Sequence, residues 1–510
     1  MAGTQNILIG VGGTGARCVE AFIHLSVAGL VDGRTWVGLV DQDQTNGNST
    51  KSTTLLSAAI DLRKRLRRSE ASDLGSESPF FSAELTSPVR SALWLPFAEM
   101  NPTLRSFFAY NLLPPGPRSL MDVLYEHKTE QELLLDVGFC GRPNIGAAIV
   151  TARASAGEDE YWRDLLDVLR AAARGGQDTR VFVVGSIFGG TGAAGLPTIA
   201  RLLKRLVERE QLTAVRVGGG LMLPYFNYGA PPAGDDRVIA RSDDFLENSQ
   251  DALRYYARVL SGQRVFDRLY AIGWSPLISL PYLDRGGERQ TNPSLIPELY
   301  AALAAANFFT DEAPTIGESR VMVAGRRANA LPDWSDLPSP KVGEAKLRQR
   351  LGQLVRFAAA FQWIYSPALV GNMGGVAREG WYQGLIASAG ASPTTPEAQA
   401  LIAKLNDYCT SVLRWVGELS LWSDTKQLPL FDVRAFAERL DPRRESELTR
   451  IRAPSTRSLA EAFPVLVGGP RASSLSDIFE ELTYSRPRAS ERGVGAFISA
   501  LHRACSIADG

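Results

Sequence analysis

The sequence predicts an α/β protein with a doubly wound parallel sheet, followed by a mostly α-helical C-terminal domain. Two segments have the order strand, glycine turn, helix; one begins at Gln5 and the other at Arg180. Both strands are nearly continuous apolar runs, which is typical of strands buried on both faces of a parallel sheet. Beyond Val342 the apolar residues recur mainly with helical spacing. The 510 residues of the chain suffice for two or three domains.

The first segment comprises a strand at Gln5–Ile9, a glycine turn at Gly10–Gly15 and a helix at Ala16–Leu30. A second strand, Thr35–Val40, ends at Asp41, and this order is typical of the opening of a doubly wound sheet. The later elements predicted for the α/β domain are a helix at 159–173, strands at 180–184, 215–223 and 265–272, and helices at 197–208, 244–260 and 293–309.

We divide the chain into three parts. Residues 1–310 form the α/β domain, which includes the central helix 293–309 and a surface insertion at about 51–130 that is partly rich in Ser, Pro and Phe. Residues 311–340 form a connecting segment, and residues 341–510 form the helical domain. Beyond residue 310, helices are predicted at 346–365, 396–421, 475–482 and 494–507, and short strands at 321–323 and 465–467.

Charge balance and cysteine content exclude several classes of function. Lys and Arg together number 55, as do Asp and Glu, so no basic excess favours nucleic acid or an anionic membrane. The cysteines (Cys18, Cys140, Cys409 and Cys505) form no CxxC pair, and the three histidines cannot complete a spaced metal site with them. We therefore expect a reducing, cytoplasmic environment and no protein-bound metal. No apolar run reaches the roughly 20 residues of a spanning helix, so we expect no membrane insertion.

Two glycine-rich loops form the clearest chemical pattern. Gly10–Ala16 has the sequence GVGGTGA, and Phe188–Gly195 has the sequence FGGTGAAG. Glycine lets backbone N–H groups approach phosphate oxygens without obstruction by Cβ, and the following helix adds partial positive charge. One such loop fits a dinucleotide fold, an adenylating enzyme or a structural turn; two on one sheet predict two walls of one phosphate site. The GxxxxGK[ST] pattern of a Walker P-loop is absent from the sequence.

Four ordered motifs resemble the tubulin/FtsZ superfamily, and more closely its divergent bacterial tubulin-like members, across about the first 310 residues. IGVGGTGA at Ile9–Ala16 is similar to the first phosphate loop of FtsZ, and VDQD at Val40–Asp43 lies where the family has an acidic loop. GRPNIGAA at Gly141–Ala148 is similar to a loop with a Pro-x-aliphatic-Gly core. FGGTGAAGLPTIA at Phe188–Ala200 is similar to the signature GGGTG(S/T)G with its helix. The resemblance implies a cytoskeletal, filament-forming protein that binds GTP or GDP, with Mg²⁺ held through the nucleotide.

The resemblance also implies which residues contact the nucleotide. Residues of the two loops would surround the phosphates: Gly12, Gly13, Thr14, Gly15, Gly189, Gly190, Thr191 and Gly192. Asn144 and Gly146 would border the terminal phosphate, and Asp43 would help to hold water or Mg²⁺. Asn292 would pair with the purine base through its amide. It could equally be the N-cap of a helix that opens with Pro293, and the two roles are compatible.

Hydrolysis in this superfamily is completed by carboxylates of the next subunit, so the resemblance implies self-assembly. DWSD at Asp333–Asp336 is similar to the acidic pair of the family's water-activating loop, and both carboxylates could orient an attacking water. An ordinary solvated turn flanked by prolines is the alternative. About 20 residues separate this pair from the end of the central helix, a long connection. Asp311 and Glu312 are therefore rival candidates.

Three positions depart from the FtsZ pattern. Arg17 and Leu331 stand where FtsZ has Asn, and Phe188 replaces the first glycine of the signature loop. Nucleotide binding is thus better supported than turnover.

Three functions fit the sequence. The first is a GTPase whose hydrolysis is coupled to self-assembly into filaments or oligomers. The second is a nucleotide-dependent switch or scaffold with little turnover, whose C-terminal domain binds another protein. The third is an adenylating or dinucleotide-binding enzyme built on residues 9–43, with strand-end carboxylates at Asp41 and Asp43. The second glycine loop and the absence of a zinc-binding CxxC pair disfavour the third.

Overall fold

The computed structural model describes residues 4–67, 78–99, 102–136, 138–139, 142–156, 159–229, 244–281, 287, 290–310, 320–326, 330–338, 343–371, 373–390, 392–423, 426–440, 448–488, 491 and 493–507. Within them lies a parallel sheet of eight strands, with the order β10-β8-β6-β5-β1-β2-β3 and with β4 paired to β2. Its strands are β1 (Thr4–Val11), β2 (Arg34–Val40), β3 (Glu84–Thr86), β4 (Leu93–Trp94), β5 (Asp178–Ser186), β6 (Val215–Met222), β8 (Arg268–Ile272) and β10 (Arg320–Ala324). The predicted parallel α/β class is confirmed, and the architecture is consistent with a Rossmann-like nucleotide-binding core.

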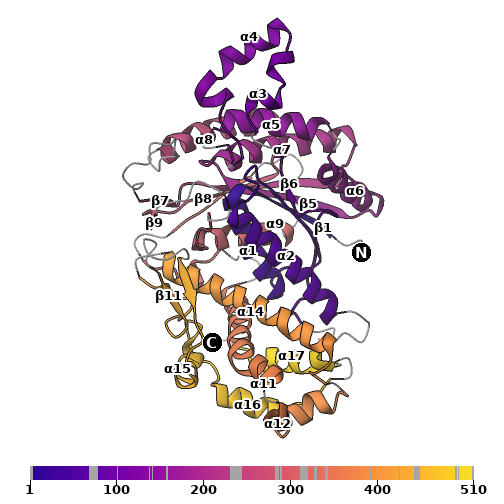
Figure 1. Cartoon of the computed structure of the whole chain (residues 1–510), viewed down its shortest axis with the longest axis vertical. Helices are drawn as coiled ribbons and strands as arrows, with labels where there is room; N and C mark the ends of the chain where they lie inside the picture. The colour runs from indigo at the N-terminus through magenta and orange to yellow at the C-terminus, as the bar shows by residue number, and fades with distance from the viewer. Residues whose placement is uncertain are drawn as a thin grey trace.

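Helices cover both faces of this sheet, as Figure 1 shows. One face is covered by α1 (Gly12–Val27), α2 (Gly47–Leu66) and α9 (Ile296–Thr310). The other face is covered by α5 (Pro143–Ala156), α6 (Glu160–Arg174), α7 (Gly190–Arg209) and α8 (Asp244–Gln263). The helices that follow the two glycine loops, α1 and α7, thus lie on opposite faces.

The alternation of side chains along the strands explains why both faces need cover. In β1, Ile7 and Ile9 pack into the core on the α7 side, whereas Leu8 packs into the core on the α1 side. In β5, Val181 and Phe182 divide between the same two cores. Because successive side chains of a strand point to opposite faces, these continuous apolar runs require a helical layer on each side.

The C-terminal part is mostly helical and joins the core on the α1 side. Its helices are α10 (Glu344–Ala360), η4 (Phe361–Tyr365), α11 (Ser366–Gly371), α12 (Met373–Val376), α13 (Gly380–Tyr382), η5 (Gln383–Ala387), α14 (Pro396–Trp422), α15 (Thr456–Ala462), η6 (Phe463–Val465), α16 (Leu475–Tyr484) and α17 (Gly493–Ala504). A two-stranded antiparallel sheet, β11 (Ala437–Arg439) with β12 (Thr449–Ile451), lies beside α14. One hydrophobic cluster spans this junction; His24 of α1, for example, packs on Trp415 of α14 with ring centroids 4.7 Å apart.

The structure divides the expected insertion at 51–130. Residues 51–66 belong to α2, whose apolar residues, such as Leu55 and Leu62, are buried in the core. β3 and β4 extend the central sheet beyond β2. The strand expected at 321–323 likewise joins this sheet, because β10 pairs with β8. The expected strand at 465–467 reduces to one bridge between Phe431 and Val467.

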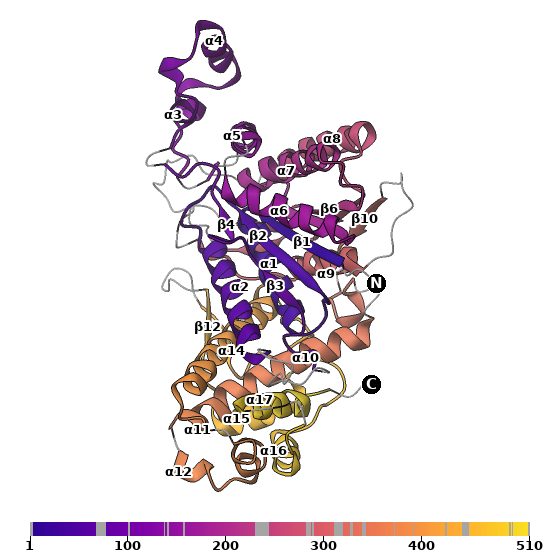
Figure 2. The same cartoon turned by 90° about the vertical axis from the view of Figure 1, so that its right-hand side faces the viewer.

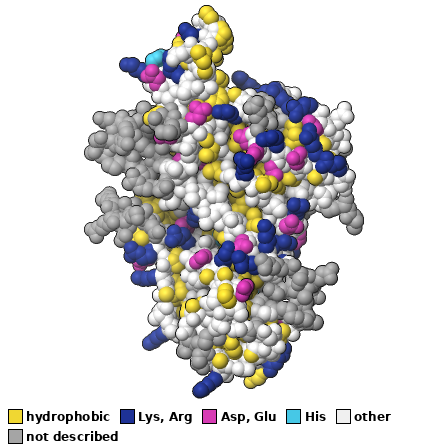
Figure 3. Space-filling model, turned by 45° about the vertical axis from the view of Figure 1, so that its right-hand side comes forward, with side chains coloured by type: hydrophobic (Ala, Val, Ile, Leu, Met, Phe, Trp, Pro, Cys, Tyr) yellow, Lys and Arg dark blue, Asp and Glu magenta, His cyan; other side chains and the backbone are white. Residues whose placement is uncertain are grey.

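A helical projection follows β4 and extends beyond the body of the molecule (Figure 2). It contains α3 (Leu104–Phe107), η1 (Tyr110–Leu112), α4 (Pro115–Leu124) and η2 (His127–Gln131). Leu112, Leu120, Val123 and Leu124 of the projection are exposed, and hydrophobic side chains are visible on its tip in Figure 3. In the part of the chain that the structure describes, no helix is both long and apolar enough to cross a membrane.

A buried ion pair joins α1 to α9 beneath the first glycine loop. Nε of Arg17 lies 2.5 Å from Oε1 of Glu298, and both side chains are almost fully buried. Tyr225 donates its hydroxyl to Oε1 of Glu298 at 2.6 Å, and the Leu295 N–H donates to Oε2 at 2.9 Å. This carboxylate therefore caps α9 and neutralises a buried guanidinium at once. Glu298 fixes the start of α9 relative to the glycine loop.

We predict that Glu298→Gln lowers the free energy of unfolding by about 3–5 kcal/mol, because it leaves the buried Arg17 charge uncompensated. Denaturant titration of wild type and variant measures the difference. Glu461→Gln is the matched control, since Glu461 pairs with Arg457 at the exposed surface and such pairs contribute about 0–1 kcal/mol. Equal stability of the two variants would contradict a structural role for the buried pair.

Candidate functional site

The two glycine-rich loops meet at the carboxyl edge of the central sheet. β1 and β5 are neighbours, with Val11 opposite Gly185. From this pair the chain continues to β2 on one side and to β6 on the other. Such a topological switch point leaves a crevice outside the strand ends, where α/β proteins bind ligands. A Cβ built on Gly12 would lie 3.3 Å from the backbone nitrogen of Gly192, so the two loops face each other directly.

Both following helices begin at this switch point without a side-chain cap. Val11 and Gly189 are the N-cap residues of α1 and α7, and neither makes a side-chain capping hydrogen bond. The first N–H groups of a helix have no partner within the helix, and together with the helix dipole they favour an anion. Thr14 and Thr191 lie in the first turns and are buried. Two helix N-termini thus converge where the sequence predicts phosphates.

Packing accounts for some of the glycines but not for all of them. A Cβ on Gly15 would lie 2.7 Å from the Val184 carbonyl oxygen, and one on Gly192 would lie 2.4 Å from the Ser186 oxygen. Gly12 has φ of +71°, a conformation that favours glycine. The three atoms nearest to a Cβ on Gly13 would belong to the side chains of Asn46 and Asn48, at 3.3–3.6 Å. Gly13 therefore faces the polar side chains at the start of α2.

Two buried carboxylates follow β2. Asp41 accepts hydrogen bonds from the Ser49 hydroxyl at 3.0 Å and from the Asp43 N–H at 3.3 Å. Burial, with the neighbouring Asp43 charge, raises the pKa of Asp41 to about 7. Asp41 is thus held by its own loop and by the first turn of α2, and it changes its charge near neutral pH.

Asp43 holds its own loop in place. Its Oδ1 accepts the Thr45 N–H at 3.1 Å, and its Oδ2 accepts the Gly287 N–H at 2.8 Å and the Asn46 amide at 3.3 Å. Burial raises the pKa of Asp43 as well. Gly138 lies nearby, since a Cβ there would be 3.9 Å both from Asp43 Cβ and from the Thr191 hydroxyl. Asp43 and Thr191 of the second glycine loop therefore border the same residue, Gly138.

The first turn of α2 lies against the first glycine loop. Asn46 caps this helix by accepting the Asn48 N–H at 2.9 Å and the Ser49 N–H at 3.4 Å, and its amide donates to Gln290 at 2.7 Å. Asn48 is 1% exposed, and its Oδ1 accepts the Asn292 N–H at 3.0 Å. Within the described residues, the Asn48 amide nitrogen has no hydrogen-bond partner.

Asn292 lies beside this turn and is not the N-cap of the central helix. α9 begins at Ile296, three residues beyond Pro293, with Glu298 capping the Leu295 N–H. The Asn292 amide instead donates to the Tyr228 hydroxyl at 3.1 Å. Tyr228 belongs to β7 (Phe226–Tyr228), which pairs with β9 (Ile278–Leu280) in a small parallel sheet. The N-cap alternative is thereby excluded, and base recognition by Asn292 stays a prediction.

The side chain of Arg17, which stands where FtsZ has Asn, is buried and binds only groups inside the protein among the described residues. Its guanidinium binds Glu298 and donates to the Tyr225 hydroxyl at 2.8 Å and to the Thr14 hydroxyl at 3.5 Å. The Glu298 carboxylate helps to raise the pKa of Arg17 well above its ordinary value, outweighing the opposite effect of burial. Arg17 therefore remains charged and shapes the wall below Thr14.

The structure places Asn144 and Gly146 at the start of α5. The Asn144 side chain is exposed and donates to Glu130 of the projection at 2.9 Å. Gly146 is buried, and a Cβ there would lie 2.6 Å both from Ala194 Cβ and from the Phe139 ring. Close packing of α5 on α7 accounts for this glycine, while Asn144 connects α5 to the projection.

Asp333 and Asp336 form the two ends of a short 3-10 helix, η3 (Trp334–Asp336). Asp333 accepts the Ser335 N–H at 2.8 Å, and Asp336 accepts the Asp333 N–H at 3.0 Å, in a reciprocal capping box. Trp334 is buried between them and donates to the Gly468 carbonyl at 3.2 Å. This local geometry is that of a capped turn docked on the C-terminal domain. Asp311 and Glu312 lie outside the described residues.

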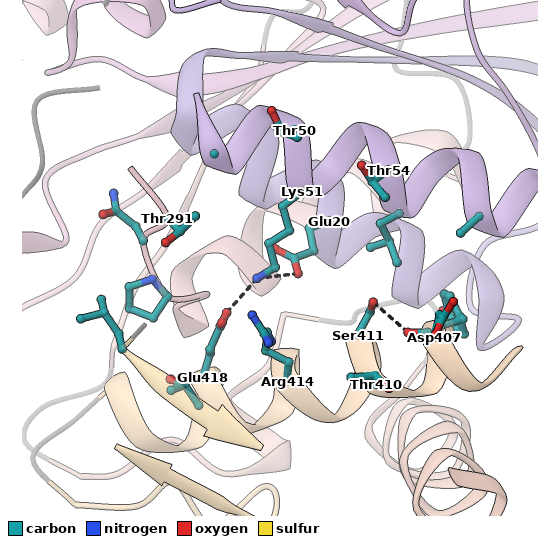
Figure 4. A pocket seen from close by; sticks show the side chains of 18 of the residues that line it. Glu20, Thr50, Lys51, Thr54, Thr291, Asp407, Thr410, Ser411, Arg414 and Glu418 are labelled. Atoms are coloured by element: carbon teal, nitrogen blue, oxygen red, sulfur yellow. Dashed lines mark hydrogen bonds and ion pairs between the residues drawn. The ribbon is translucent and has the colours of Figure 1, made fainter. Parts of the chain in front are cut away.

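A large cavity lies beside the glycine loops, between α2 and α14 (Figure 4). Its volume is about 1020 Å³, and Thr45, Thr291 and Asn292 form the part of its lining nearest the acidic loop. At its floor, Lys51 forms ion pairs with Glu20 at 3.0 Å and with Glu418 at 2.9 Å. The glycine loops do not line this cavity. The cavity thus adjoins the candidate phosphate site without containing it.

No protein-family model matches the chain, and no curated protein matches it. Among solved structures, the chain is similar to CetZ from Methanosaeta thermophila strain DSM 6194. That match has a TM-score of 0.24 and 13% sequence identity, and it covers 53% of this chain and 46% of that one. The alignment spans less than half of the CetZ chain, and a likeness at this level carries no argument about the site.

Sequence reasoning missed Asn46 and Asn48 as site residues and gave Asp41 too little weight. The pattern that could have found them is the polar run after β2, with the sequence DQDQTNGNS from Asp41 to Ser49. Asx residues before a helix indicate an N-cap, and this run follows the acidic strand end that the sequence already predicts at the site. The described cysteines (Cys18, Cys409 and Cys505) are free and buried, whereas Cys140 lies outside the described residues. No group of three or more metal-ligating His, Cys, Asp or Glu side chains occurs among the described residues.

We predict that Asp41→Asn flattens the pH dependence of stability. The pKa of about 7 in the folded protein lies above the ordinary 3.8, so the folded state binds the proton more tightly than the unfolded chain. The stabilisation from Asp41 is complete below about pH 4 and is lost as the pH rises through about 7. Denaturant titrations between about pH 4 and pH 7 should show that the stability of wild type falls more steeply with rising pH than that of Asp41→Asn. Each unit of pKa shift corresponds to about 1.4 kcal/mol.

The exposed Asp251 supplies the control for that experiment, since Asp251→Asn changes the same chemical group on the surface of α8. A wild-type slope equal to that of Asp41→Asn would contradict the assigned environment of Asp41.

Proposed function

We propose that this chain binds GTP in a tubulin/FtsZ-like manner, with the phosphates between its two glycine-rich loops. The observation that supports this most strongly is the juxtaposition of Gly12 and Gly192 at the switch point between β1 and β5. The helices that begin at these loops, α1 and α7, have no side-chain cap, and the first N–H groups of a helix have no partner within it. An anion with several phosphate groups is the ligand that such a pair of helix ends favours.

The chain's own groups suit such a ligand. Backbone N–H groups of Gly12, Gly13 and Gly15 would hold one part of the phosphate chain, and those of Gly189–Gly192 would hold the terminal part. Mg²⁺ bound through the nucleotide would neutralise phosphate charge, and Asp41 and Asp43 would anchor its water ligands. Asn292, beside Tyr228, would pair with the base. Guanine offers both a ring N–H and an exocyclic amine to such an amide, and GTP is therefore preferred over ATP.

Hydrolysis in this proposal depends on self-association. Asp333 and Asp336 lie on a turn packed against the C-terminal domain. They would act on the nucleotide of a neighbouring subunit by orienting the attacking water. Filaments or oligomers would then be the active form, and turnover per subunit would rise with protein concentration.

A second candidate is a nucleotide-dependent switch with little turnover. Its support is the capping box, because the carboxylates of Asp333 and Asp336 already accept hydrogen bonds within their own turn. In that case the nucleotide would control a partner bound by the C-terminal domain. The two candidates share the binding site and differ only in phosphate release.

We predict that wild type binds GTP with Mg²⁺ and that its phosphate release per subunit rises with protein concentration. Asp333→Asn and Asp336→Asn retain capping amides, so they should keep GTP binding while lowering phosphate release by about 100-fold or more. A fluorescent GTP analogue measures binding, and a phosphate assay over a concentration series measures turnover.

Gly190→Trp is the blocked-site control, because it places an indole in the second glycine loop, where the proposed phosphates would bind. Unchanged phosphate release in both Asp variants would favour a different source of turnover. Wild-type binding without any phosphate release would favour the switch. Absence of GTP binding by wild type would refute the proposed function.

A further inference from the structure

The Asn48 side chain lies at the first glycine loop. Its amide oxygen has a hydrogen-bond partner, but its amide nitrogen has none among the described residues. It is the second residue of α2 and is 1% exposed. Its Oδ1 accepts the Asn292 N–H at 3.0 Å, so the other end of the amide must be the nitrogen. That nitrogen lies 3.3 Å from the position of a Cβ on Gly13. The donor therefore points at the loop.

A buried donor without a partner is costly, on the order of 1–3 kcal/mol. The Asn48 amide nitrogen is such a donor. By contrast, both the amide nitrogen and the amide oxygen of Asn46, two residues earlier, have hydrogen-bond partners. Gly13 leaves the space in front of the Asn48 nitrogen without a Cβ, and α1, a helix of 16 residues, begins beside it without a side-chain cap. The missing partner is thus an acceptor at the N-terminus of α1.

We propose that Asn48 is a phosphate-binding side chain that donates its amide N–H to an oxygen held by the first glycine loop. This assignment rests on the proposed function and adds a contact from α2, outside both glycine loops. The ligand is a phosphate group, carried by a nucleoside diphosphate or triphosphate or present as free phosphate. Asn48 would bridge it to the segment before α9, because the same amide accepts the Asn292 N–H.

That bridge leads to the C-terminal domain through described contacts. Two residues after Asn292, the Ser294 N–H donates to Glu418 of α14 at 2.9 Å. Lys51, one turn after Asn48 on α2, binds the same Glu418 carboxylate (Figure 4). Binding of phosphate polarises the Asn48 amide and so strengthens its bond to the Asn292 N–H. Occupancy of the phosphate site is thereby coupled to the contact between α14 and the segment that precedes α9.

The experiment compares wild type with Asn48→Asp, which retains an acceptor for the Asn292 N–H and turns a carboxylate oxygen toward the phosphate. Binding of GTP, GDP, guanosine and inorganic phosphate is measured by isothermal titration. Hydrogen exchange of residues 291–296 is measured with and without GTP. We expect the variant to lose about 10-fold to 100-fold in affinity for GTP and GDP, with guanosine affinity unchanged. We also expect GTP to slow this exchange in wild type, and to slow it much less in the variant at saturating GTP.

The matched control is Asn307→Asp, the same change in α9 at a residue whose amide donates to Tyr270. Should Asn48→Asp fail to fold, Asn48→Ala is titrated in its place, with the same loss expected. Wild-type affinity for GTP in a folded Asn48 variant would overturn this assignment and leave the proposed function standing. Binding of inorganic phosphate but not of GTP by wild type, lost in the Asn48 variant, would uphold Asn48 and refute the nucleotide proposal. Binding of neither ligand by wild type would refute both.

Discussion

The close approach of β1 and β5 at their carboxyl ends is the constraint on which the candidate site depends. A Cβ on Gly185 would lie 2.7 Å from the Val11 oxygen, and one on Gly195 would lie 2.7 Å from the Val11 side chain. Only glycine at these two positions lets the second loop and the first turns of α7 lie against the end of β1. The N-termini of α1 and α7 are consequently held close together, because each helix follows its strand directly or after a short loop. A larger residue at Gly185 or Gly195 would push the two glycine-rich loops apart, whether or not a ligand is bound.

The first turn of α2 connects that crevice to the rest of the molecule. On one side Asn48 faces Gly13, and on the other Lys51 pairs with Glu20 and Glu418. Burial and the nearby Glu418 charge raise the pKa of Glu20, while Lys51 opposes that rise. A buried group of three charges adds little stability compared with apolar packing, but it tolerates only a narrow range of positions. The orientation of α14 relative to α2 is therefore tied to the turn that faces the glycine loop.

The sequence was sufficient for the parts of the fold that depend on local periodicity and insufficient for those that depend on tertiary pairing. The strands at β1, β2, β5 and β6 were predictable because buried parallel strands are continuous apolar runs bounded by turns. β3 has three residues, so nothing local distinguishes it from a loop. The strand expected at 321–323 is present as β10, but its pairing with β8 in the central sheet could not be read from the sequence. The contact of the loops through Gly12 and Gly192 could be expected from their repeated pattern. The Asn48 contact could not, because it joins residues that only the sheet brings together.

The geometry also separates the requirements for binding from those for turnover. The proposed binding would use backbone N–H groups that are already oriented, whereas the proposed turnover would need a carboxylate free to orient water. Asp43 already accepts hydrogen bonds from three donors, and Asp41 is buried with a pKa near neutrality. Asp333 and Asp336 each accept a capping hydrogen bond, and a lost cap costs about 0.5–2 kcal/mol. A neighbouring subunit that recruited these carboxylates would have to offset that cost through its own contacts. Within the proposed GTPase, hydrolysis is therefore more sensitive to assembly than binding is.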